Sequence, residues 1–319
     1  MKKKVLFWIT IALVAFTSCN SNDDLGDKSI RIPGVTFDGD EECCLPEEAL
    51  LVYNFLKTLK PIPEFSLEVE GLYDVTAYSK SGSFHVGYND IYFVATKKST
   101  GNYVKELQVK NVTPLMTMDM GKMTMQHSTP VASSVVIADD KFSALKHGWI
   151  SFLMSSTEKD FWELSFDISV LGRKASLKNT RFTVDALPSG QNWLKSFKVG
   201  EKTYYVSLVN PDSWQTGVND IKAYVSEAGN PKTVPYPEST EKLTIEIDPR
   251  MPDMGNHTSP DNIALTRQTD GSYKGVINLT MTGLWRIHLT VKDANGNVVY
   301  GGEELGDDGL SNLFWDVTI

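Results

Sequence analysis

The sequence predicts an all-β protein, with two tandem immunoglobulin-like β-sandwiches preceded by a short N-terminal helix. Two observations carry this prediction. Apolar and polar residues alternate strictly in many short segments, such as WRIHLTV at 285–291, and turn signals such as Asp270-Gly271 separate these segments. The second observation is an internal repeat, because short motifs return later in the chain in the same order. A single barrel is the alternative to two sandwiches.

Three pairs of motifs define the repeat. They are GYNDI and GVNDI (87–91 and 217–221), HSTP and HTSP (127–130 and 257–260), and WELSFDI and WRIHLTV (162–168 and 285–291). The first two pairs are both separated by 130 residues, which indicates a tandem duplication. We therefore place the first sandwich at 67–186 and the second at 187–319.

A different pattern precedes the first repeat, in the short helical segment 41–66. From Pro46 to Lys60 the apolar residues recur at helical spacing, which predicts one amphipathic helix with a proline in its first turn. Cys43 and Cys44 lie just before this helix. The pair could be a soft-metal ligand or a vicinal disulfide, or a small packing element. Its lack of a counterpart in the second repeat favours packing.

The N-terminus has the features of a secretory signal: three lysines, an apolar run too short to span a bilayer, and a cysteine at position 19. Phe16-Thr17-Ser18-Cys19 resembles a bacterial lipobox, although Phe16 replaces the usual leucine. The resemblance implies a signal peptide at 1–18 and a membrane anchor on acylated Cys19.

The acidic stretch NSNDDLGD follows directly after Cys19, and it predicts a flexible acidic tether over residues 19–40. The stretch resembles the export signal of surface lipoproteins in the Bacteroidetes group. We therefore expect a lipid-anchored protein of the cell envelope, in the outer membrane and either periplasmic or surface-exposed.

Charge and motifs exclude several functions. Removal of the three signal-peptide lysines leaves 28 basic against 40 acidic residues, a net charge of −12, which disfavours nucleic acid as a partner. The sequence has no nucleophile elbow, no His-Glu-x-x-His motif and no phosphate loop. We expect a protein that is not an enzyme.

Methionines mark the candidate site. Five of the ten methionines fall within LMTMDMGKMTMQHSTP (115–130), which also contains His127, and the second repeat has PRMPDMGNHTSP (249–260). Thioether and imidazole groups are soft, neutral ligands that suit Cu(I). The alternative is that the methionines fill the core, where their flexibility is useful.

The second copy, together with GSYKGVINLTMTGLWRIHLTV (271–291), resembles the YtkA-like family, extracytoplasmic domains with a β-sandwich similar to the CopC-like copper proteins. The first copy matches more loosely, with SSTEKDFW where the family has a short glycine turn before tryptophan. We therefore predict that the protein binds or handles copper. The candidate ligands are Met251, Met254 and His257 at the more family-like site, and Met120, Met123, Met125 and His127 at the second. The alternative function is a structural or interaction module that presents loops to another envelope protein.

Overall fold

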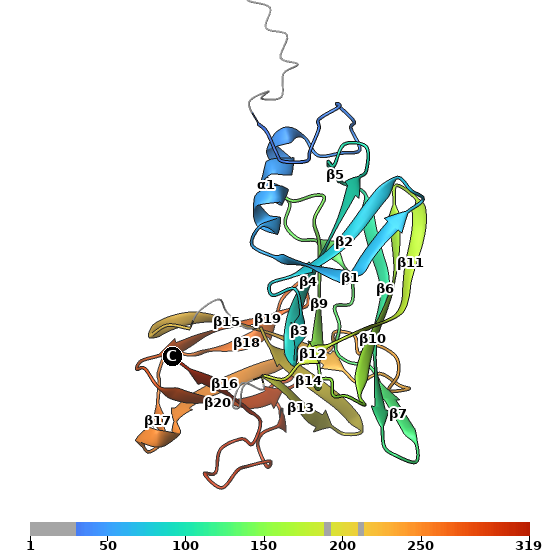
Figure 1. The fold of residues 1–319 in the computed structure, drawn as a ribbon. Coiled ribbons are helices and arrows are strands. Elements are labelled where there is room, and N and C mark those ends of the chain that lie inside the picture. Colours follow the sequence, from blue (N-terminus) through green and yellow to red (C-terminus); the bar gives the residue numbers. More distant parts are fainter. Residues whose placement is uncertain (1–29, 188–192, 210–213) are drawn as a thin grey trace, which may run out of the picture.

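The structure, a computed structural model, describes residues 30–187, 193–209 and 214–319. The expected signal peptide, Cys19 and the first part of the tether lie outside these ranges. The described chain forms two β-sandwiches in succession, with a short helix at the N-terminal end (Figure 1). This confirms the predicted fold class. No helix in the described ranges is both long and apolar enough to cross a bilayer.

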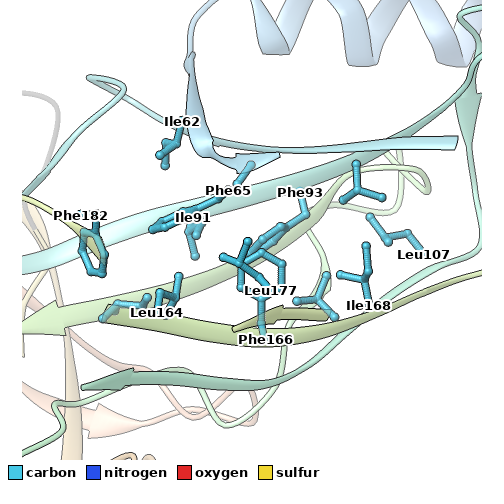
Figure 2. Close-up of a cluster of buried hydrophobic side chains, with 14 of the residues drawn as sticks. Ile62, Phe65, Ile91, Phe93, Leu107, Leu164, Phe166, Ile168, Leu177 and Phe182 are labelled. Atoms are coloured by element: carbon cyan, nitrogen blue, oxygen red, sulfur yellow. The ribbon is translucent and has the colours of Figure 1, made fainter. Parts of the chain in front are cut away.

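Two facing sheets make up the first sandwich. Its strands are β1 (Lys60–Val69), β2 (Tyr73–Ser79), β3 (Phe84–His85), β4 (Gly87–Lys97), β5 (Tyr103–Val104), β6 (Leu107–Asp119), β7 (Thr124–His127), β8 (Val136–Ile137), β9 (Lys146–Phe152), β10 (Phe161–Val170), β11 (Arg173–Phe182) and β12 (Val184–Asp185). One sheet has the order β1-β2-β4-β9-β8, with β5 also paired to β4, and the other has the order β11-β10-β6-β7. The short strands β3 and β12 belong to neither sheet and pair with each other in parallel. The core lies between them, where Phe65 and Phe93 of the first sheet meet Phe166 and Leu177 of the second (Figure 2).

One continuous sheet makes up the second sandwich. Its strands are β13 (Leu194–Val199), β14 (Lys202–Leu208), β15 (Gly217–Glu227), β16 (Thr244–Met251), β17 (His257–Thr258), β18 (Ile263–Arg267), β19 (Tyr273–Leu279), β20 (Leu284–Lys292), β21 (Val298–Tyr300) and β22 (Phe314–Thr318). Their order is β13-β14-β15-β19-β18-β16-β20-β21, with β17 on β16 and β22 on β20. Strand β18 pairs with both β19 and β16, so it joins the two layers. Trp285 and Trp315 are buried between these layers.

The repeated motifs occupy corresponding places in the two sandwiches. Asn89 of GYNDI donates two hydrogen bonds, to the carbonyl oxygens of His85 and Gly87, and accepts one from the His85 amide. Asn219 of GVNDI makes the same three bonds with Gln215 and Gly217. The two tryptophans also correspond, because the indoles of Trp162 (β10) and Trp285 (β20) are both fully buried and both donate to a methionine carbonyl oxygen.

Helix α1 spans Pro46–Leu56, four residues shorter than predicted at its C-terminal end. Strand β1 then begins at Lys60, before the expected domain start at 67. The residue that precedes a proline avoids helical geometry, and here Lys60 precedes Pro61. No strand is predicted at this point because Ile62 and Phe65 are buried three positions apart, at a register irregularity that breaks the alternation.

The tether is also shorter than the predicted 19–40. Ile32 is buried in an apolar cluster with Ala49 and Val52 of α1, and Val35 and Phe37 pack against that cluster. These apolar side chains lose contact with water only if the segment folds back onto the helix. Residues 30–40 therefore belong to the folded part of the protein.

Candidate functional site

The methionine-rich segment forms the β6–β7 hairpin, whose end projects from the first sandwich (Figure 1). Met116 lies opposite His127, and Met118 lies opposite Met125. The pairing continues into the turn, where the Met120 amide donates to the Met123 carbonyl oxygen at 3.0 Å. Gly121 has a φ of 79° in this turn, a conformation that favours glycine.

Register places the methionines on one face of the hairpin. Side chains alternate between faces along a strand, and directly opposed residues share a face. The face therefore carries the three opposed pairs Met116 with His127, Met118 with Met125, and Met120 with Met123. The other face is polar, and there the Gln126 amide donates to the Thr117 hydroxyl at 3.0 Å. We call the face that carries the methionines the thioether face.

Exposure rises along the thioether face toward the turn. Met116 is 0% exposed and belongs to the core of the first sandwich, and Met118 is half-buried against that core. Met125 is 45% exposed, Met120 57% and Met123 64%. The outer part of the face thus presents three accessible thioethers, and opposed residues have Cβ atoms about 5 Å apart, within reach of flexible side chains.

His127 lies at the inner end of the thioether face with one ring nitrogen occupied. Its Nδ1 lies 2.7 Å from the Ser128 carbonyl oxygen, and its ring meets Trp162 edge-on at 5.5 Å. A carbonyl oxygen only accepts, so Nδ1 carries the hydrogen and neutral His127 keeps a lone pair on Nε2. Metal-binding histidines commonly have this arrangement, in which the second nitrogen is held by a carbonyl or carboxylate oxygen.

In the second copy the candidate ligands differ in their exposure to solvent. Met251 ends β16 opposite His257 on β17, so this pair corresponds to Met116 and His127. Met251 is 4% exposed and packs in the second core, whereas Met254 lies exposed on the 3-10 turn η1 (Pro252–Met254). His257 is also exposed. The sequence favoured this copy, but the structure gives it one accessible thioether, against three on the hairpin.

Cys43 and Cys44 are free thiols, and both are buried. Burial raises the pKa of each thiol, to about 12 for Cys44, where the neighbouring Glu48 carboxylate adds to the effect. The thiolate is the form that binds soft metals. The pair therefore acts in packing, between the core of the first sandwich and the cluster under α1.

Two histidines have partners that the sequence did not reveal. His147 lies on β9, and its Nε2 donates to the Asp90 carboxylate at 2.6 Å. His288 occupies a polar position of the alternating segment WRIHLTV but is buried, and its Nδ1 donates to the Ser311 carbonyl oxygen at 2.6 Å. No pattern in the sequence pairs these residues, because the partners lie 57 and 23 positions away. Among the described residues, His, Cys, Asp and Glu side chains form no group of three that could hold a metal ion.

The segment 128–131, which follows the hairpin, forms main-chain hydrogen bonds with the second sandwich. The amides of Ser128 and Val131 donate to the carbonyl oxygens of Lys232 and Tyr236, and the Tyr236 amide donates to Thr129. Beside this contact, Tyr224 of the second sandwich stacks on two aromatic rings of the first, Trp149 at 4.5 Å and Tyr88 at 5.8 Å. A cleft of about 890 Å³ opens between the sandwiches at this aromatic cluster, and Asp90, His147 and Glu238 line it.

Burial affects the pKa values of two carboxylates that line this cleft, those of Asp90 and Glu238. For Asp90 burial acts to raise the pKa, but hydrogen bonds from His147 and from the Tyr88 hydroxyl hold it below its usual value. For Glu238 burial prevails and raises the pKa, although the Trp149 indole donates to its carboxylate at 3.2 Å. The two carboxylates thus differ in how readily they take up a proton.

The second sandwich is similar to a known family of domains. Residues 198–290 match the family model described as YtkA-like. The match runs from the end of β13 into β20, so it lies within the second sandwich and includes Met251, Met254 and His257. A comparison with curated proteins found no match.

Two solved structures show weak similarity. One is the adhesin InvE of Yersinia pseudotuberculosis, with 10% identity and a TM-score of 0.20, where the alignment covers 74% of this chain and 55% of the adhesin. The other is dimeric latent PorU of Porphyromonas gingivalis, with 13% identity and a TM-score of 0.20, where the alignment covers 73% of this chain and 22% of PorU. The chain thus spans about half of the first protein and under a quarter of the second. At these TM-scores neither likeness supports a statement about this chain.

Proposed function

We propose that the protein binds Cu(I) on the thioether face of the β6–β7 hairpin. The observation that carries the proposal is the cross-strand register, which aligns Met118 with Met125 and Met120 with Met123. Thioethers are soft and neutral, and they select Cu(I) over hard cations such as Mg²⁺ and Ca²⁺. Nε2 of His127 supplies a nitrogen ligand at the inner end of the row.

The second copy has a smaller part in this proposal. Met254 and His257 are accessible and can contribute a weaker site, whereas Met251 would have to leave the second core to bind a metal. Both copies place a buried methionine opposite a histidine, which supports the view that the first sandwich is a diverged YtkA-like domain. The first copy has added an exposed, methionine-rich hairpin to this common plan.

The cellular setting is part of the proposal. We propose a lipoprotein of the outer membrane, anchored by acylated Cys19, that handles copper in the cell envelope without acting as an enzyme. The support is the signal-like N-terminus, together with the extracytoplasmic character of the resembled family. Cys19→Ala should release the protein from the membrane fraction. A variant that stays membrane-bound would contradict the anchor.

A competitive titration tests the copper site. Cu(I) affinity is measured against a chromogenic Cu(I) chelator for the wild type and for the triple variant Met120→Leu, Met123→Leu and Met125→Leu. Leucine keeps the volume but removes the sulfur. We expect the triple variant to lose affinity by roughly tenfold or more, in the range seen for disrupted metal sites. Met116→Leu, in the core of the same face, is the matched control and should retain the affinity.

His127→Ala separates the nitrogen ligand from the thioethers. Thioethers take up no proton in the accessible pH range, so competition between protons and Cu(I) arises at imidazole ligands. The wild type should therefore show a pH-dependent affinity and His127→Ala a flatter one. Equal pH dependence in both proteins would remove His127 from the site.

The alternative function is an interaction module, in which the exposed methionines contact another envelope protein. Exposed methionines do serve as adaptable docking surfaces. The triple leucine variant distinguishes the two functions, because leucine preserves an apolar surface. Full Cu(I) affinity in that variant, or no Cu(I) binding by the wild type at micromolar concentration, would leave the interaction module as the better account.

A further inference from the structure

The two sandwiches differ at one edge. In the second, β18 pairs with β19 on one side and with β16 on the other, through Thr266 opposite Thr244 and Leu265 opposite Ile245. In the first, β8 takes the corresponding place beside β9 but has only two residues, and among the described strands it pairs with β9 alone. Strand pairing therefore joins the two layers at this edge of the second sandwich but not of the first. We call the unjoined edge of the first sandwich, between β8 and the first part of β6, the open seam.

The open seam is a groove of about 490 Å³. One wall is the first part of β6, residues 107–110, and the other is formed by residues 135–137, which include β8. Val136 and Ile137 are 52% and 47% exposed, although both are large and apolar. Exposed apolar side chains beside an unpaired strand are typical of a surface that takes another strand.

The backbone of β6 has a free edge at this groove. Residues Leu107–Lys110 pair with β10 on one side only, because β7 pairs with β6 from Met116 onward. In the described part of the chain no strand lies along the other side of these four residues. The corresponding strand of the second sandwich, β16, has that side occupied by β18.

The charged side chains that line the groove are both basic, Lys110 and Lys146. Lys110 is exposed. Lys146 is buried, and its ammonium donates to the carbonyl oxygens of Lys105 and Ser143. Among the described residues no carboxylate lies in ion-pair contact with either lysine. A strand with acidic residues would complement this groove.

We propose that the open seam binds an extended peptide of another protein, which adds to the free edge of β6 as a further strand. The peptide alternates apolar residues, packed on Val136 and Ile137, with acidic residues that face the exposed Lys110. Main-chain hydrogen bonds supply the binding and the alternate side chains supply the selectivity. This inference is independent of copper binding, since the groove shares no residue with the thioether face.

A defined probe tests the proposal on the full folded chain. The probe is a fluorescein-labelled, end-capped octapeptide in which valine and glutamate alternate, and binding is followed by fluorescence anisotropy. We expect saturable binding that weakens by roughly tenfold in Lys110→Glu, because like charges in contact disfavour association. Lys198→Glu changes another exposed lysine, on β13, and should leave the affinity unchanged. An octapeptide with lysine in place of glutamate should bind more weakly to the wild type.

Amide hydrogen exchange locates the peptide. Bound peptide should slow the exchange of backbone amides within 107–110 and leave β16 unaffected, because its equivalent edge is already paired. Loss of binding on N-methylation of alternate peptide bonds would further support strand addition. No saturable binding at millimolar peptide, protection at another surface, or equal affinity of Lys110→Glu and Lys198→Glu would overturn the proposal. So would a sedimenting dimer whose 107–110 amides are protected without peptide, because the occupant would then be a second copy of the chain.

Discussion

Asn89 and Asn219 each hold the start of a central strand by the same three hydrogen bonds. Both side chains are almost fully buried, so truncation leaves main-chain polar groups without a partner. We predict that Asn89→Ala and Asn219→Ala each lower the free energy of unfolding by roughly 1–3 kcal/mol.

Chemical denaturation of both single variants and of the double variant checks this prediction. The two sites lie in different sandwiches, so the effects should add within about 0.5 kcal/mol. A large loss of unfolding free energy in one asparagine variant and none in the other would show that the two motifs do not stabilise their strands equally.

Asp90 couples stability to pH. Its folded-state pKa is lowered by His147 and Tyr88, so its contribution is present above the unfolded value of about 3.9 and is lost as pH falls through the folded value. The Asp90 side chain is 39% exposed, so we predict that Asp90→Asn costs only roughly 1 kcal/mol or less at pH 7, after allowance for solvent screening. The difference from wild type should vanish in strong acid.

Urea denaturation at pH 7 and at about pH 2.5 measures this change. Asp220→Asn is the matched control, because Asp220 is the exposed aspartate of GVNDI and surface substitutions usually change stability by less than about 0.5 kcal/mol. A cost for Asp90→Asn that is the same at both pH values would contradict the ionised-carboxylate account.

At the scale of elements, β6 and β16 each place a methionine in the core: Met116 lies three residues before the end of β6, and Met251 is the last residue of β16. We predict that alanine at either position costs roughly 2–5 kcal/mol, because it removes buried volume and leaves a cavity. Alanine at Met123 or Met254, both exposed, should change stability by less than about 0.5 kcal/mol. Thermal unfolding of the four single variants checks this division. A small loss of stability in Met251→Ala would contradict the core position of Met251 and support it as an accessible ligand.

The sequence predicted most strands because apolar alternation reports which face of a strand is buried, as in β20. It could not predict which residues on either side of Gly121 lie opposite one another, because the register of a hairpin depends on how the Gly121 turn closes. It could not assign Met251 to the core either, since the same spacing of Met251, Met254 and His257 fits one accessible loop. The sequence could not predict the open seam beside β8, because the absence of a strand pairing has no sequence motif.

At the scale of the whole molecule, aromatic side chains and main-chain hydrogen bonds connect the two sandwiches. Tyr224 is buried against Trp149 and Tyr88. We predict that Tyr224→Ala lowers the free energy of unfolding by roughly 3 kcal/mol and loosens the arrangement of the two sandwiches. Calorimetry should then resolve two unfolding transitions, and small-angle scattering should show a larger maximum dimension.

Tyr300→Ala is the control for this variant, because Tyr300 packs on Phe197 inside the second sandwich. It should destabilise that sandwich without changing the arrangement of the pair. An unchanged scattering profile for Tyr224→Ala would show that the main-chain bonds between Ser128, Val131 and the second sandwich are sufficient by themselves.

X-ray absorption at the copper edge of the Cu(I)-loaded protein tests the central claim most directly. The thioether face predicts a first coordination shell dominated by sulfur, with at most one nitrogen from His127. In the triple variant Met120→Leu, Met123→Leu and Met125→Leu the sulfur contribution should fall sharply, whereas in Met116→Leu it should persist. A shell of nitrogen and oxygen alone in the wild type, or a sulfur shell unchanged in the triple variant, would contradict a copper site on the β6–β7 hairpin.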